Sequence, residues 1–132
     1  MKEKVKYWID LADYDIETAK AMFETKRYMY VGFMCHQTIE KAMKAIIANH
    51  LPQGEIPPKM HDLEKLANIA GVTSQLSEQQ QDFIDVLNPL NIESRYPEYK
   101  KQIQSILTRE VCAELIKKSE ELLCWTKKKL ER

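Results

Sequence analysis

The chain has 132 residues, of which 44% are hydrophobic and 30% are charged. This length supports one hydrophobic core and is too short for two, so we expect a single domain over residues 1–132. Lys and Arg together number 20, as do Asp and Glu, so the formal net charge is zero. No field of the whole protein therefore attracts nucleic acid or an anionic membrane, and any anion site must be local.

Apolar residues recur at helical spacing almost throughout, which predicts an all-α, up-and-down bundle of about five helices. The first predicted helix has a core stripe made of Val5, Trp8, Ile9, Ala12, Ile16, Ala19 and Phe23. A second apolar stripe on another side consists of Tyr7, Leu11, Tyr14, Thr18 and Met22. A helix that is apolar on two sides has two neighbours, so we expect a homodimer that buries the second stripe.

The second helix is predicted over about residues 28–51, because Pro52 cannot continue it. A short helix is then predicted to begin at His61 or Asp62. It ends before Gly71, which suits the left-handed conformation that follows many helices.

Ser77 followed by Gln80 is a capping-box signature for a helix that reaches about Leu87. Tyr96 is predicted to be extended, because the residue before a proline is pushed out of the α region. The last helix is predicted over about residues 108–130.

The three cysteines, Cys35, Cys112 and Cys124, lack Cys-x-x-Cys spacing and lie beside apolar residues. We expect buried free thiols in a reducing cytoplasm. The N-terminal residues lead directly into an amphipathic helix without a signal-peptide pattern, and no apolar run approaches the ~20 residues that span a bilayer. A soluble, cytoplasmic protein without a membrane partner is therefore expected.

The second predicted helix carries a polar stripe formed by Gln37, Glu40, Lys41 and Lys44. Such a stripe is typical of a solvated helix surface, and it is also where a binding site can lie. His36 lies one turn before Glu40. On a mostly apolar helix, a single His is typical of a satisfied interior residue.

Two further motifs accompany this stripe, His61-Asp62-Leu63 at a predicted helix start and Arg95-Tyr96-Pro97 in a loop. Together with His-Gln-x-x-Glu-Lys-Ala-x-Lys-Ala over residues 36–45, they resemble the HEPN family of small helical proteins. The resemblance covers nearly the whole chain. It implies a HEPN-like helical fold. It also implies one or more of three roles, which are nucleotide binding, service as the partner of a minimal nucleotidyltransferase and, in some branches, RNA cleavage.

The nuclease branch of that family is marked by an Arg followed, after four to six residues, by a His. No His follows Arg27, Arg95 or Arg109 at that spacing, so the resemblance implies a non-nuclease member and we expect no RNA cleavage. Two alternatives stay open. One is an atypical HEPN ribonuclease toxin that uses Arg95 with His61 or His36, and the other is a purely structural dimerisation module.

For a ligand site, we expect Lys41, His61 and Arg95 to converge on the phosphates of a nucleotide, ATP or a related one. Sequence-distant cations are costly to cluster without compensation, and Glu40 offsets only one of them. The expected ligand-binding residues are Gln37, Glu40, Lys41, His61, Arg95 and Tyr96. The structural interpretation of the same residues is that Asp62 or His61 caps a helix and that Arg95 pairs with a carboxylate such as Glu40.

No motif for a cofactor, a phosphate-binding glycine loop or a catalytic nucleophile is present. The only plausible metal ligands are His36, Glu40 and His61, which lack the paired Glu and His spacing of carboxylate-bridged bundles. We therefore expect neither a cofactor nor a metal, and no catalysis by the chain itself.

Overall fold

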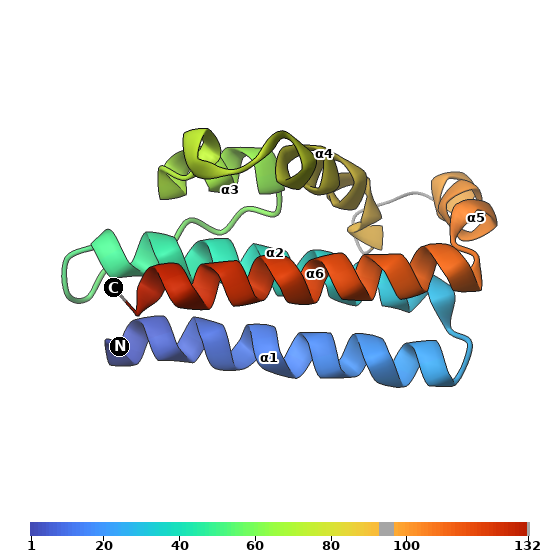
Figure 1. The fold of residues 1–132 in the computed structure, drawn as a ribbon, viewed down its shortest axis with the longest axis horizontal. Coiled ribbons are helices and arrows are strands. Elements are labelled where there is room, and N and C mark those ends of the chain that lie inside the picture. Colours follow the sequence, from blue (N-terminus) through green and yellow to red (C-terminus); the bar gives the residue numbers. More distant parts are fainter. Residues whose placement is uncertain (93–96, 132) are drawn as a thin grey trace.

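Three long helices form the body of the molecule. The computed structural model describes residues 1–92 and 97–131, and over these residues it contains helices and no strand. The long helices are α1 (Glu3–Glu24), α2 (Tyr28–His50) and α6 (Arg109–Leu130), which lie lengthwise beside one another (Figure 1). α1 and α2 are antiparallel, α6 runs in the same direction as α2, and both termini lie at one end.

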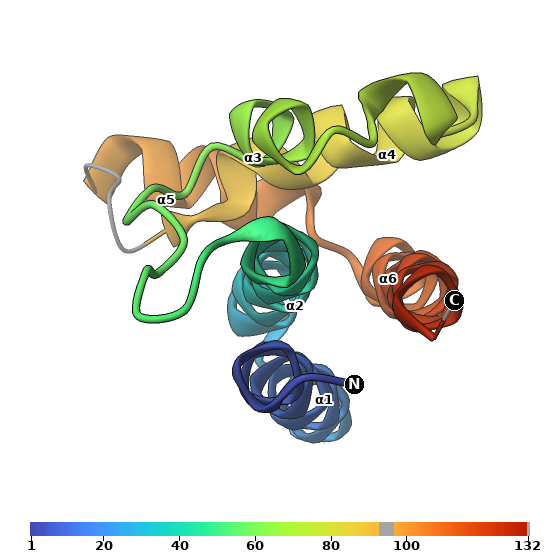
Figure 2. The ribbon, with the colours of Figure 1, turned by 90° about the vertical axis from the view of Figure 1, so that its left-hand side faces the viewer.

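Shorter elements form a second layer over the long helices and carry the chain back to the start of α6 (Figures 1 and 2). In chain order they are α3 (Leu63–Ala70), η1 (Thr73–Gln75), α4 (Glu78–Leu87), η2 (Asn88–Leu90) and α5 (Pro97–Ile106). The expected all-α bundle is confirmed, with six α-helices in the described residues where about five were predicted.

The predicted helix ends are confirmed where a local hydrogen bond defines them. Asp62 caps α3, and Gly71 follows α3 with a φ of 75°, which suits a residue without a Cβ. Both halves of the capping box of Ser77 and Gln80 are formed at the start of α4. The side chain of Thr108 accepts a hydrogen bond at the first turn of α6.

Helix α5 was missed by the sequence analysis. Pro97 restricts the residue before it, but its own fixed φ and missing N–H suit the first turn of a helix, and α5 begins there. Only Ile103 of α5 is buried, so its apolar pattern is weak. The predicted extended conformation of Tyr96 lies outside the described residues.

The core stripe of α1 is confirmed by burial, and its second apolar stripe faces outward. Tyr7 is 59% exposed and Tyr14 is 73% exposed. The close approach of α2 to the end of α5 depends on Gly32, because a Cβ there would lie 3.0 Å from Leu107 Cδ1. α2 therefore packs as the central helix, whereas one side of α1 has no neighbour among the described residues.

The cysteines divide into a buried pair and an exposed one. Burial raises the pKa of the Cys35 thiol to about 12 and that of Cys112 to about 11. Cys124 is exposed, so the prediction of three buried thiols was wrong for this residue.

None of the described helices is long and apolar enough to cross a membrane.

Candidate functional site

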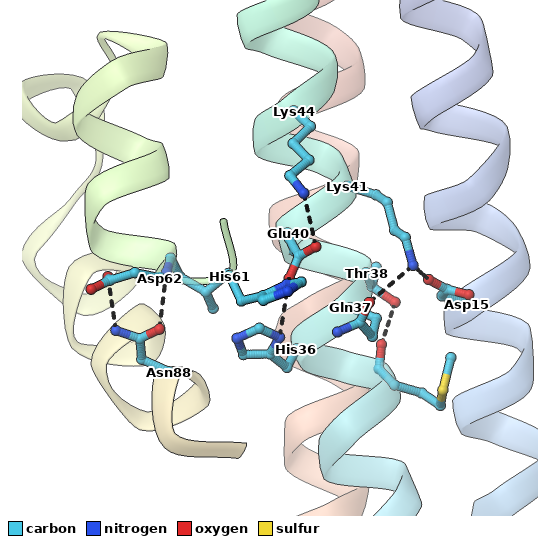
Figure 3. A network of polar contacts seen from close by, with 12 residues as sticks. Asp15, His36, Gln37, Thr38, Glu40, Lys41, Lys44, His61, Asp62 and Asn88 are labelled. Carbon is cyan, nitrogen blue, oxygen red and sulfur yellow. Dashed lines mark hydrogen bonds and ion pairs between the residues drawn. The ribbon is translucent and has the colours of Figure 1, made fainter. Parts of the chain in front are cut away.

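Glu40 is the centre of a buried polar network on α2 (Figure 3). Its Oε2 accepts a hydrogen bond from Lys44 Nζ at 3.1 Å, and its Oε1 lies 2.9 Å from His61 Nδ1. In the tautomer with its proton on Nδ1, the His61 ring donates this hydrogen bond to the Glu40 carboxylate. His36 Nδ1 lies 3.8 Å from the same Oε1. The Glu40 carboxylate thus connects Lys44 and His36, which lie on its own helix, to His61, the residue before the cap of α3.

Lys44 is held on two sides. Its ammonium pairs with Glu40 and lies 5.6 Å from the centroid of the Trp8 ring on α1, a cation–π geometry. Glu40 and Lys44 are both buried, so the interpretation of this stripe as a solvated surface was wrong for them. The cause is tertiary, because α1 covers one side of the stripe and the approach to α3 covers the other. His36 is fully buried, which confirms its prediction as an interior residue.

Lys41 belongs to a second polar group that faces α1. Its Nζ donates to Asp15 Oδ2 at 2.5 Å and to Gln37 Oε1 at 3.1 Å. Asp15 is buried and was not among the predicted site residues. A signal for it exists in the sequence, since Asp15 follows Ala12 by three residues and precedes Ala19 by four, in the middle of the core stripe.

The structure therefore brings Glu40 to His61 and Gln37 to Lys41, and it directs these two pairs to different sides of α2 (Figure 3). The charge argument made from sequence counted Glu40 as the only compensating carboxylate. Asp15 is a second one, and it pairs with Lys41. Arg95 and Tyr96, the remaining expected ligand residues, lie outside the described residues.

The start of α3 is organised by Asp62 and by Asn88, a residue that the sequence analysis did not select. Asp62 Oδ1 accepts from the backbone N–H of Lys65 and from Asn88 Nδ2, both at 3.2 Å, while Asn88 Oδ1 accepts from Leu63 N–H at 2.9 Å. Partial burial raises the pKa of Asp62, but these hydrogen bonds and the charge of Lys65 outweigh it and hold the pKa below 3.8.

The free N–H groups at this helix start are thus satisfied from within the chain, as the capping interpretation predicted for Asp62. His61, one residue earlier, keeps 60% of its side chain exposed although Nδ1 is paired with Glu40. Its Nε2 is the ring nitrogen available to a ligand. Over the described residues, no three His, Cys, Asp or Glu side chains are arranged to share a metal ion.

Comparisons with known proteins identify the family of the chain. The model of the HEPN domain matches residues 5–130, and the chain belongs to the HEPN family. A crystal structure of TT1696 from Thermus thermophilus is similar to it with a TM-score of 0.79 at 18% identity, covering 97% of this chain and 99% of that one. ST0689, described as an archaeal HEPN homologue, has a TM-score of 0.65 at 23% identity, with 98% of each chain covered. The TM-scores show that the chain shares its fold with both proteins. No curated protein matches the chain.

Proposed function

We propose that this chain is a non-catalytic HEPN module that binds a nucleotide and serves as the partner of a minimal nucleotidyltransferase. The observation that carries the proposal is the exposed imidazole of His61, which buried Glu40 orients through Nδ1. When the ring is protonated, Nε2 is a second donor, suited to a phosphate oxygen. The sequence-based ligand set remains the candidate, with His61 as its most accessible described member.

Arg95 is the second proposed phosphate ligand. It follows buried Ile92 by three residues in the chain, and Asn88, a little earlier, is bonded to Asp62 beside His61. The closeness of Arg95 in the chain to this anchored segment is what supports its choice as a ligand residue. Lys41 is a less direct candidate for a phosphate ligand, because Asp15 already compensates its positive charge.

Calorimetric titration with ATP tests the proposal. Arg95→Ala and His61→Ala are each expected to lose about 1–3 kcal/mol of binding free energy, the scale of a hydrogen bond to a charged group. The wild-type affinity should fall as salt rises. Lys101→Ala is the matched control, since it removes one exposed cation from α5. Equal affinity in all four proteins, or no binding by any of them, would contradict nucleotide binding at this site.

The partner role has its own test. The chain mixed with a minimal nucleotidyltransferase encoded beside it should elute as one complex in size-exclusion chromatography with light scattering. Separate elution of the two proteins would contradict this part of the proposal and leave the ATP titration to be judged on its own.

The absence of catalysis is tested by incubation with single-stranded and structured RNA in the presence of chelator. We expect no cleavage, because the Arg and His spacing of the nuclease branch is missing and His36 is fully buried. Cleavage that disappears in both Arg95→Ala and His61→Ala would instead support the atypical toxin.

A second candidate function, a structural dimerisation module, is favoured by the exposed stripe on α1. Tyr7 and Tyr14 are the most exposed aromatic side chains of that stripe. Burial of large apolar area is a main source of dimer stability, so a homodimer through this stripe should dissociate in the double variant Tyr7→Ser/Tyr14→Ser. Light scattering at micromolar concentration measures this, and a monomer mass for the wild type would contradict it.

A further inference from the structure

A long apolar groove lies between α4 and α6, away from the polar network. It has a volume of about 890 Å³, and Figure 2 shows α4 above α6 on this side of the molecule. The apolar side chains that line it include Phe83, Val86, Val111, Leu115, Leu122 and Trp125. Val86 is 54% exposed and Val111 is 41% exposed, so part of this apolar surface faces solvent. The groove shares no residue with the proposed nucleotide site.

The α6 wall of the groove has the spacing of a helix-packing seam. Val111, Leu115, Leu122 and Trp125 are separated by four, seven and three residues, with Lys118 at the intermediate position. Alternating steps of four and three residues are the pattern by which one helix receives the side chains of another. At 1.5 Å per residue, the seam from Val111 to Trp125 is about 21 Å long, which matches a partner helix of about four turns.

The groove continues past its α6 wall toward α5. A second hollow of about 300 Å³ is lined by some of the same residues, Val86, Val111 and Leu115, and by Ile106 of α5. Ile106 is 60% exposed. Val86, Val111 and Ile106 are thus the exposed apolar side chains of the groove, while Leu115 and Leu122, 4% and 2% exposed, form its floor.

The charges beside the groove define the chemistry of that occupant. α4 carries three acidic residues, Glu78, Asp82 and Asp85, and no Lys or Arg. On α6, Lys118 is paired with Glu114 at 4.0 Å, and Glu121 adds a further negative charge to the lining. At the far end, Lys129 bonds to Gln75 and lies over the Trp125 ring. The α4 wall is thus acidic overall, and Asp82 is the α4 carboxylate that lines the groove itself, together with Glu114 and Glu121 of α6.

A second copy of the chain offers a poorer match. Its exposed apolar stripe, on α1, is bordered by Asp10, Asp13 and Glu17, and each of these carboxylates is paired with a lysine, Lys6, Lys127 and Lys20 in turn. The border of the stripe is therefore close to neutral and has no excess of basic side chains to match the acidic residues of the groove. A basic helix of a different protein supplies that complementary charge.

We infer that the groove between α4 and α6 binds one amphipathic helix of a partner protein. The partner helix presents apolar side chains at i, i+4, i+7 and i+11 to the seam on α6, and Lys or Arg side chains to the acidic wall of α4. The apolar residues supply the affinity and the basic residues fix the orientation of the helix.

The probe is a fluorescent, helix-stabilised peptide of about 15 residues with Leu at i, i+4, i+7 and i+11 and Lys on the flanking positions. Fluorescence anisotropy with the full chain should show saturable binding that weakens with added salt. Two peptides serve as controls, one with the same composition in scrambled order and one with Glu in place of each Lys. Both should bind at least about tenfold more weakly.

Variants of the chain locate the binding. The double variant Val86→Ser/Val111→Ser should bind the peptide with Leu and Lys at least about tenfold more weakly than the wild type does. Asp82→Lys should bind it about fivefold more weakly at low salt. The matched controls are Ile69→Ser, which removes an exposed apolar side chain of α3, and Glu55→Lys, which reverses an exposed charge in a loop. Neither control should change the affinity.

Three results would overturn the inference. They are equal binding of the basic and acidic peptides, no binding of the basic peptide, and equal binding by the groove variants and their controls. Light scattering adds a fourth, because a wild-type dimer that dissociates in Val86→Ser/Val111→Ser would identify a second copy as the occupant. Circular dichroism of each variant confirms that it is folded.

Discussion

The region between α1, α2 and α3 and the region between α4 and α6 differ in the kind of side chain that they bury. Between α1, α2 and α3, charged residues are buried, and Lys41 and Lys44 each have a carboxylate partner. Between α4 and α6, apolar residues such as Val86 and Val111 remain partly exposed. Glu40 and Lys44 on the polar stripe of α2 are thus interior, whereas the apolar side chains of Val111 on α6 and Val86 on α4 lie at the surface.

This difference arises from which helices have neighbours. α2 is central and is covered by α1 on one side and by the segment before α3 on the other, so its polar residues must find partners inside the chain. α6 packs against α1 and α2 with one face, and its other face lies beside the short elements α4, η1 and α5. The exposed apolar positions on this second face mark a region with room for another helix.

The largest expected effect comes from breaking the buried network. Glu40→Ala leaves the buried ammonium of Lys44 and the imidazole of His61 without their carboxylate, and removing one partner of a buried pair costs about 3–5 kcal/mol. Chemical denaturation measures this loss. Glu120→Ala is the control, because it removes a carboxylate from the exposed pair with Lys20 and should cost less than about 1 kcal/mol. Similar losses in both variants would show that burial of the network contributes little.

A matched pair on α4 sharpens the comparison between core and groove. Ile84 is 3% exposed and Val86 is 54% exposed, only two residues apart on the same helix. Ile84→Ala should cost about 2–5 kcal/mol of unfolding free energy, the usual cost of such a cavity in a core. Val86→Ala should stay within about 0.5 kcal/mol, as at a surface position. A large loss in Val86→Ala would mean that the groove is part of the core.

The cap of α3 gives a smaller effect that depends on pH. Asp62→Ala should cost about 1 kcal/mol near neutral pH, because it removes the hydrogen bonds to Lys65 N–H and Asn88. The pKa of Asp62 is lowered from 3.8 in the folded state, so its ionisation stabilises the fold above that pH. The part due to ionisation is lost as the pH falls through the folded pKa. Denaturation curves of both proteins at several pH values should therefore converge in acid, and a constant difference would contradict the assignment.

The smallest expected effect concerns reactivity, with no change in stability. At pH 8 a thiol reagent should modify Cys124 in the folded protein and leave Cys35 and Cys112 unmodified, because both of these are buried with raised pKa values. After denaturation all three should react. Mass spectrometry counts the modified thiols, and rapid reaction of Cys35 in the folded state would indicate an opening between α2 and α6.

How far the sequence predicts this protein depends on the range of each interaction. Helix ends were predicted where the deciding hydrogen bond joins residues three apart, as in Ser77 with Gln80 and in the Asp62 cap. The start of α5 was missed, since Pro97 is compatible with both a helix start and an extended loop. In the candidate site, the residues of α2 and His61 were selected, whereas Asp15 and Asn88 were overlooked because their partners are 26 residues away in the chain.

The amino-acid sequence by itself determined the helical class and the core stripe of α1, because apolar periodicity and local caps act within one or two turns. The resemblance to the HEPN family came from the motifs of residues 36–45, 61–63 and 95–97, and the match to the family model shows the membership. The tertiary structure alone decided that Glu40 and Lys44 are buried and that Lys41 turns to Asp15 and His61 to Glu40. It also decided that Val111 of α6 and Val86 of α4 stay partly exposed beside the groove. Helical spacing specifies which residues share a face, whereas only the packing of neighbouring helices determines whether that face meets water, a partner charge or another helix.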